Sequence, residues 1–125
     1  MAIFKKWIGN TEYTFCAEDY SNKAGLVHSV ELFAGDVKLS TARLTYQNRT
    51  WETYKFQTAM LRCVSDALER IEDGISGTVK RINGWDRLTA SRRETIAEII
   101  NSVPDILFLR KLYKAVQTGD WRATA

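Results

Sequence analysis

The chain contains few side chains that could serve as a nucleophile or a general base, namely His28, Cys16 and Cys63. Imidazole is the side chain whose ordinary pKa lies closest to neutral pH, so His28 is the natural candidate for acid–base catalysis. His28 lies, however, in an alternating apolar segment beside Val27 and Val30, and no residue at a recognisable spacing completes a catalytic group. We therefore expect a packed or hydrogen-bonded structural histidine, and we predict that the protein is not an enzyme.

The two cysteines lie 47 positions apart and form no CxxC pair. A nucleophilic thiolate needs a neighbouring base or cation, whereas Cys63 falls near the apolar face of a predicted helix. A structural zinc site needs four cysteine or histidine ligands, and the whole chain has three such residues. We expect two free thiols in a reducing compartment, no bound metal and no cofactor.

The basic residues make a stronger case for binding. Five of them lie within fourteen positions around Trp85, and arginine beside an aromatic side chain is a combination that binds phosphate backbones and unpaired bases. In the alternative interpretation, Arg92 and Arg93 form a solvated helix face while Trp85 packs into the core. The candidate residues for binding a partner or nucleic acid are Lys80, Arg81, Trp85, Arg87, Arg92 and Arg93.

Charge is unevenly distributed along the chain, whose formal net charge is +3. Residues 1–79 carry nine basic and ten acidic side chains, whereas residues 80–125 carry nine basic and five acidic ones. An inhibitor that mimics nucleic acid needs a strongly negative surface, so this class is disfavoured. Nucleotide binding is not predicted either, because the glycines at 74, 77 and 84 follow a helix instead of linking a strand to one.

The first half of the chain is expected to form a β-sheet. Alternation of polar and apolar residues predicts strands at 12–17, 26–33 and 37–46, with a hairpin turn at Gly35. The apolar phase changes within the last of these strands, which predicts a β-bulge near Ser40 or Thr41. Three antiparallel strands with one covered face make a plausible sheet, and that face needs a helix.

A long amphipathic helix is predicted from about residue 51 to residue 73. Asn48 and Thr50 offer N-caps, and Gly74 is expected to end the helix. Residues 74–88 then read as a linker, within which 78–82 could form a short strand, a helical turn or a loop. The helix face that packs on the sheet is expected to contain Tyr54, Leu61, Val64, Leu68 and Ile71, widened by Trp51, Met60 and Ala67.

Two shorter helices are predicted at 89–101, with Thr89 as N-cap, and at 104–118, where Pro104 suits the first turn. From the first of them, Ile96, Ile99 and Ile100 are expected to point inward. The predicted fold is a single α+β domain over residues 1–125. In this fold a three-stranded antiparallel sheet is packed by one long helix and followed by a C-terminal helical hairpin.

Two segments carry a resemblance to known proteins. Residues 44–56 contain an Asn-Arg-Thr-Trp-x-x-Tyr-x-Phe pattern at a helix start, and residues 87–93 contain a Leu-Thr-x-x-Arg pattern. Both resemble small accessory proteins encoded by bacteriophages, plasmids and other mobile elements. The resemblance implies a bacterial host cell and a protein that binds and disables a host defence protein, as restriction inhibitors and anti-CRISPR proteins do. Physically, Trp51, Tyr54 and Phe56 read as an aromatic staple that fixes the helix on the sheet.

The leading functional prediction is a non-enzymatic protein that binds and inhibits, or modulates, a host macromolecular machine. Its partner would be a host protein or nucleoprotein complex, and four Trp, five Tyr and five Phe could supply the binding hot spots. The alternative is a basic nucleic-acid-binding accessory protein of a phage or mobile element, whose affinity would fall steeply with salt. A homodimer is also open, with Met60 and Cys63 lining the seam between two copies.

The sequence predicts no contact with a membrane. No segment has the pattern of an export signal, and none approaches the roughly 18 apolar residues that a membrane span requires. We therefore expect a cytoplasmic protein.

Overall fold

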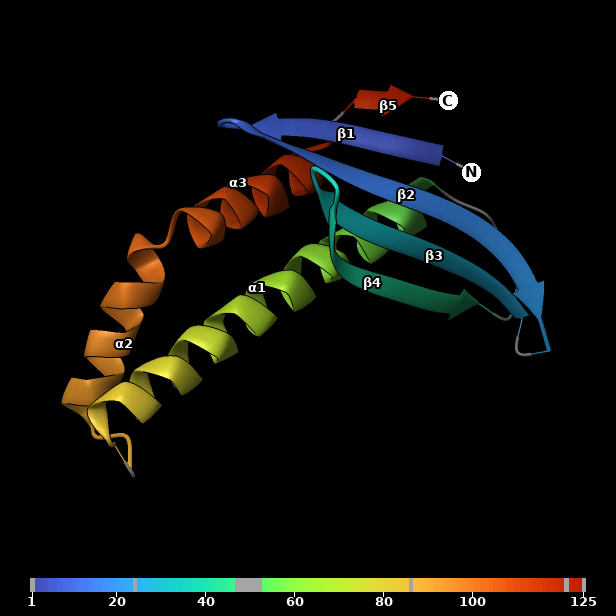
Figure 1. The fold of residues 1–125 in the computed structure, drawn as a ribbon. Coiled ribbons are helices and arrows are strands. Elements are labelled where there is room, and N and C mark those ends of the chain that lie inside the picture. The colour runs from blue at the N-terminus through green and yellow to red at the C-terminus, as the bar shows by residue number, and fades with distance from the viewer. Residues whose placement is uncertain (1, 24, 47–52, 86, 121, 125) are drawn as a thin grey trace.

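Antiparallel strands build one sheet, and three helices complete the fold (Figure 1). The computed structural model describes residues 2–23, 25–46, 53–85, 87–120 and 122–124. The strands are β1 (Ala2–Ile8), β2 (Thr11–Asn22), β3 (Gly25–Ala34), β4 (Val37–Tyr46) and β5 (Arg122–Thr124). The helices are α1 (Thr53–Asn83), α2 (Ala90–Ser102) and α3 (Pro104–Thr118). The predicted α+β class is confirmed.

The sheet has the order β4-β3-β2-β1-β5. From β1 to β4 each strand pairs antiparallel with the next, and β5 pairs with the other side of β1 through Ile3 and Thr124. The prediction of three strands covers β2 to β4 and misses the outer two. In β1, Lys5 and Lys6 fall on opposite faces and obscure the alternation, and Lys6 Nζ lies 2.9 Å from Asp120 Oδ2.

One face of the sheet is covered by α1 and α3, and the core lies between these layers (Figure 1). On the sheet side, Phe15, Val30 and Leu32 are fully buried. From the helices, Val64 of α1 and Leu112 of α3 are fully buried against them. Leu109 and Val116 complete the contribution of α3. We call this the helix-packed face of the sheet.

The side chains of Met60 and Cys63 point into this core and have no exposed area. The suggestion that they line the seam of a homodimer is therefore wrong, because a single copy of the chain already buries both. Ala67 is buried as well, and the other predicted inward positions of α1 that can be compared, Leu61, Leu68 and Ile71, are half-buried beside the core. The N-cap residues Asn48 and Thr50, Trp51, and the side chains of Tyr54 and Phe56 lie outside the described residues.

The predicted β-bulge is present in β4. Leu32 pairs with Ser40, whereas Phe33 pairs with Lys38, so Leu39 is the inserted residue. An extra residue in one strand shifts the side chains that follow to the opposite face, which explains the change of apolar phase along this segment.

The bulge is also where α1 is tied to the sheet. Ser40 Oγ donates a hydrogen bond of 2.7 Å to the backbone oxygen of Cys63. Arg70 Nη1, further along the same helix, donates a hydrogen bond of 3.1 Å to the carbonyl of Leu39. The carbonyl of the inserted residue thus gains a donor from the helix, and the register of α1 against β4 is set by two polar contacts as well as by packing.

Gly74 does not end α1, which continues through much of the predicted linker 74–88. The reason is that Ile75 and Val79 extend the apolar stripe at helical spacing, and both are half-buried. Residues 78–82, left open by the sequence, are accordingly helical. The helix ends only at Gly84, whose φ of +64° is the left-handed conformation that glycine adopts without steric cost.

The two C-terminal helices lie close to their predicted limits. Thr89 accepts a hydrogen bond of 3.4 Å from the amide of Arg92, so it caps α2 as expected. Pro104 occupies the first turn of α3, and Gly119, with φ of +75°, ends it. The expectation for Ile99 is wrong. That side chain is 37% exposed, because α2 buries only a narrow stripe represented by Ile96.

Replacing Gly74 with alanine is expected to raise the free energy of unfolding by about 0.5–1 kcal/mol. Gly74 is helical, and a Cβ added there meets no atom within 4 Å. Gly84→Ala is the matched control and should lower stability, because its φ of +64° disfavours a side chain. Urea unfolding followed by tryptophan fluorescence compares both variants with the parent. A less stable Gly74→Ala protein would show that the helix is interrupted at this position.

Candidate interaction site

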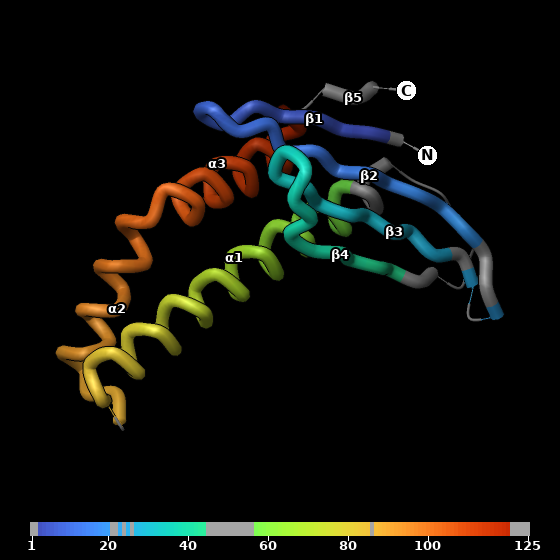
Figure 2. The backbone as a smooth tube through the Cα atoms, viewed as in Figure 1, coloured from blue at the N-terminus to red at the C-terminus, as the bar shows by residue number. Residues whose placement is uncertain are grey.

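The second half of α1 leaves the sheet and, with α2 beside it, forms a projecting arm (Figures 1 and 2). Among the described residues, no position of α1 after Ala67 is buried, and in α2 only Ile96 is. We call residues 68–85 and 87–102 the helical arm. Because it buries so little of its own surface, the arm contributes less to the core than to the area that a partner could contact.

A tight turn closes the far end of the arm. The amide of Trp85 donates to the carbonyl of Lys80 at 3.1 Å, and Gly84 between them is left-handed. Together these features make the Schellman motif that satisfies the last carbonyls of a helix. α2 begins soon afterwards, at its N-cap Thr89. The turn therefore holds the two helix ends together, and we call residues 80–85 and 87–93 the tip of the arm.

Arg92 holds the turn closed from the other side. Its Cζ lies 5.3 Å from the centroid of the Trp85 ring, within the range of a cation–π contact. Its Nη1 donates a hydrogen bond of 3.1 Å to the carbonyl of Arg87. Trp85 is accordingly half-buried, with Arg92 over one face of its ring. This arrangement lies between the two sequence interpretations, since Trp85 is neither a core residue nor an open aromatic surface.

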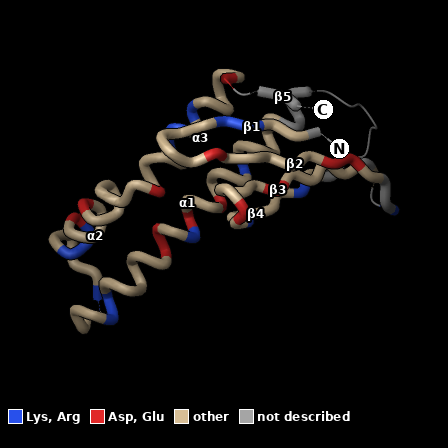
Figure 3. Tube along the Cα trace, turned by 45° about the horizontal axis from the view of Figure 1, so that its top comes forward, with Lys and Arg blue, Asp and Glu red and all other residues tan. Residues whose placement is uncertain are grey.

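The other basic residues of the tip face solvent. Arg81, Arg87 and Arg93 are exposed and Lys80 is half-exposed, and Figure 3 shows basic residues gathered at the far end of α1 and the start of α2. The structure thus brings all six candidate residues to one end of the molecule. Because most of these side chains are exposed, the arrangement fits contact with a macromolecule better than capture of a small ligand.

Ile82 is the part of this surface that sequence reasoning missed. Its side chain is 78% exposed, the largest value among the large hydrophobic residues described. Its spacing from Val79 continues the apolar stripe of α1, which hides the fact that the helix here has passed beyond the sheet. An exposed apolar side chain at the same end of the arm as the basic residues offers the two properties of a protein-binding hot spot, an apolar anchor and charged surroundings.

His28 lies away from this site, on the helix-packed face of β3. It is fully buried, and its Nδ1 lies 3.0 Å from Oδ1 of Asp19, its cross-strand neighbour on β2. The Asp19 side chain is 40% exposed, so solvent reaches the carboxylate but not the imidazole. The expected structural, hydrogen-bonded histidine is what the structure contains.

Cys63 is equally inaccessible. Its Sγ donates a hydrogen bond of 3.1 Å to the carbonyl of Val30, and its side chain has no exposed area. Burial raises the pKa of the Cys63 thiol to about 11, against a lowering contribution from the Ser40 hydroxyl. A neutral, enclosed thiol is a poor nucleophile. Cys16 is half-buried, and both cysteines are free thiols, as predicted.

No group of three or more His, Cys, Asp or Glu side chains within the described ranges is arranged to hold a metal ion. In the same ranges, no helix is both long enough and apolar enough to cross a membrane. Comparison with protein-family models, with curated proteins and with solved structures found no match to this chain.

Replacing His28 with alanine is expected to lower the free energy of unfolding by about 2–4 kcal/mol, because it leaves a cavity and removes the hydrogen-bonding partner of Asp19. Asp19→Asn is the control, which keeps a hydrogen-bonding oxygen at nearly the same size and should cost about 1 kcal/mol. Urea denaturation gives both values. Unchanged stability of His28→Ala would mean that the imidazole has no structural role.

The two thiols are expected to react very differently with Ellman's reagent. In the folded protein at pH 8, Cys16 should react first, whereas Cys63 is enclosed and its pKa of about 11 keeps it protonated. In urea both should react at one common rate. The raised pKa of Cys63 also makes the free energy of unfolding depend on pH. The contribution of the protonated thiol is fully present below pH 9, the ordinary pKa of the group, and is lost as the pH rises toward 11. Equal rates in the folded protein would contradict this assignment.

Proposed function

We propose that the protein is a non-enzymatic binding protein that inhibits or modulates a macromolecular machine by docking the tip of its helical arm on a partner protein. The observation that carries the proposal is Ile82, an apolar side chain 78% exposed at the same end of the arm as the basic residues of the tip. Burying such a side chain in a complementary pocket stabilises a complex, because the apolar area is removed from water. The flanking cations select a partner surface that is acidic around that pocket.

The residues of the tip fall into two groups according to their exposure to solvent. Arg81, Arg87 and Arg93 are open to solvent and can steer a negatively charged partner toward the arm. Arg92 and Trp85 hold the turn in one conformation, so the tip is preorganised and loses little conformational entropy on binding. The sheet then serves as the platform from which α1 projects the tip.

A bacterial defence complex is the partner class that we favour. The resemblance of residues 44–56 and 87–93 to accessory proteins of phages and mobile elements supports it, because such proteins commonly disable host defences in the manner of anti-CRISPR proteins. A small protein can block a larger machine by occupying a surface the machine needs, without any chemistry of its own. His28 and Cys63 are both fully buried, so the proposal gives neither of them a part in binding.

Binding of nucleic acid is the second candidate, and the five basic residues at one end of the arm favour it. Two features weigh against it. One face of the Trp85 ring is covered by Arg92, which limits its use for stacking on an unpaired base. In a complex with nucleic acid, Ile82 would also face the charged phosphate backbone, where its apolar side chain has nothing to pack against. The two candidates differ in how affinity should respond to salt.

Substituting Ile82 with serine is expected to weaken capture of the partner protein by about tenfold or more, the effect of removing a hot-spot anchor. The measurement is affinity capture by the tagged protein from a bacterial lysate, with and without nuclease, across a salt gradient. Val37→Ser is the matched control. Val37 is another β-branched aliphatic residue, 64% exposed, and it lies on β4 away from the arm.

The double variant Arg81→Gln, Arg87→Gln separates the two candidates. For a protein partner it should slow association and reduce the salt dependence, while nuclease treatment leaves capture intact. If the captured material is nucleic acid, Ile82→Ser should have little effect and the double variant should abolish capture at moderate salt. That second pattern would refute the protein-binding proposal.

A further inference from the structure

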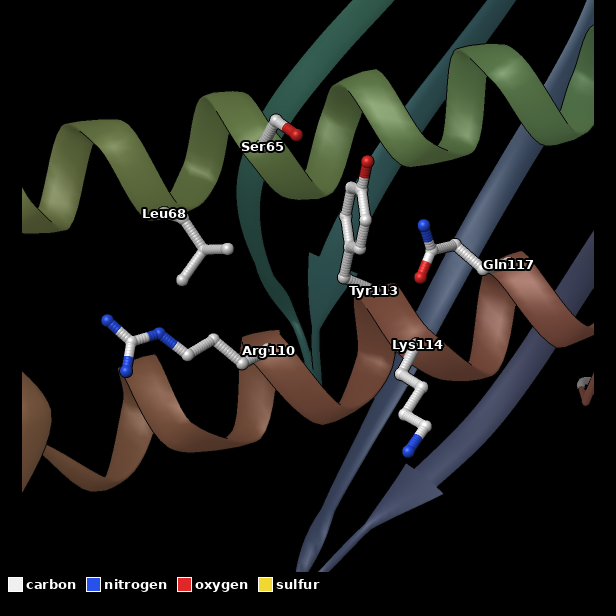
Figure 4. A pocket seen from close by; sticks show the side chains of 6 residues that line it. All are labelled: Ser65, Leu68, Arg110, Tyr113, Lys114 and Gln117. Atoms are coloured by element: carbon white, nitrogen blue, oxygen red, sulfur yellow. The ribbon is translucent and has the colours of Figure 1, made fainter.

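A groove lies between α1 and α3, near the point where the arm begins and away from the tip. It has a volume of about 430 Å³ and opens to solvent. Its lining residues are Ser65, Leu68, Arg110, Tyr113, Lys114 and Gln117 (Figure 4). The volume lies within the range of small-molecule sites, and the seam between two packed helices is a common place for them.

The floor of the groove is apolar. Figure 4 shows Leu68 of α1 and the ring of Tyr113 of α3 pointing into the space between the two helices. Both are half-buried and pack against the main core, so their positions are supported from behind. Water in contact with these two side chains has few hydrogen-bonding partners there. An apolar group of a ligand would replace that water favourably.

The rim is basic and rich in hydrogen-bond donors. Arg110 is held at one end of the groove. Its Nη1 donates a hydrogen bond of 2.8 Å to Asn101 Oδ1, and its Nη2 lies 3.7 Å from Glu72 Oε1. At the other end, Gln117 lies beside Tyr113, and Lys114 extends from the outer side of α3 (Figure 4). In the part of the chain that the structure describes, no acidic side chain forms an ion pair with Lys114.

We propose that this groove binds a small amphipathic carboxylate, with its apolar body on Leu68 and Tyr113 and its carboxylate at the Lys114 and Gln117 end. Charge complementarity assigns the anion to this end, because Glu72 already neutralises the Arg110 end. Figure 4 shows Lys114 directed away from α1, but its ammonium is exposed and carried on a flexible four-carbon stem, so a change of rotamer brings it to the open mouth when an anion binds. A wholly polar anion would leave the apolar floor wet, and a neutral apolar molecule would leave Lys114 unused.

The test is a titration of the uniformly ¹⁵N-labelled full chain with indole-3-acetate, followed by two-dimensional NMR. Indole-3-acetamide, which has the same shape without the charge, is titrated in parallel. We expect saturable shifts confined to the amides around Ser65, Leu68 and residues 110–117, with a Kd of about 1 mM, as suits a ligand of this size. The acetamide should bind about two- to fivefold more weakly.

Two variants and one control variant locate the ligand. Lys114→Gln should weaken binding about two- to fivefold, whereas Lys111→Gln, the same change at the adjacent exposed lysine of α3, should not. Ser65→Phe should fill the groove and abolish the shifts. Ser65 is exposed, so this variant is expected to fold, and its own amide spectrum verifies that.

The proposal would be overturned by no shifts up to the solubility limit, by shifts centred outside the groove, by equal binding of indole-3-acetate and indole-3-acetamide, or by equal effects of the two lysine substitutions. Shifts that depend on protein concentration without ligand would assign the groove to a second copy instead. Response to an acetylated Glu-Trp-Glu peptide but not to indole-3-acetate would assign it to a protein partner. Ligand binding in the groove can fail without the function proposed for the tip failing, because Lys114→Gln and Ser65→Phe leave the residues of the tip unchanged.

Discussion

The packing of the first half of α1 on β3 and β4 is the contact on which the rest of the molecule depends. Fully buried Met60, Cys63 and Val64 fill the space above Val30 and Leu32, and burial of this kind is the main favourable term in folding. Polar contacts then give the packing one register. The Cys63 thiol and backbone carbonyl each take part in a hydrogen bond to the sheet, so rotating α1 by one residue would leave buried polar groups without partners.

Local patterns predicted most of the elements because those elements bury a regular stripe. The alternation of β2 to β4, the bulge near Ser40 and the cap at Thr89 were all readable for that reason. β1 was not readable, because Lys6 sits on the helix-packed face and is satisfied by Asp120, a residue 114 positions away. The end of α1 was misjudged because an isolated glycine is tolerated inside a helix, and the apolar spacing of Ile75 and Val79 continues the helical pattern past Gly74.

The candidate site was partly predictable for a similar reason. The clustering of basic residues around Trp85 is a local property of the sequence, and a tight turn between two helices necessarily keeps them together. The contacts of the individual residues were not predictable. The stacking of Arg92 on Trp85, for example, depends on the direction in which α2 leaves the turn. The exposure of Ile82 and the groove at Tyr113 depend on where α1 outruns the sheet and how α3 approaches it. Neither property belongs to a single segment.

The continuity of α1 from the core to the tip makes the helix a lever. Nineteen residues separate Cys63 from Ile82, about 28 Å at the standard helical rise. A rotation of only about 10° at Cys63 would therefore carry Ile82 by about 5 Å, roughly one turn of helix. Small changes in the volume of core side chains beneath the first half of α1 should consequently move the tip, although they do not contact it. Gly74 and Gly77 lie between Cys63 and the tip, and a Cβ added at either would meet no atom within 4 Å, so the helix is expected to bend first at these two positions.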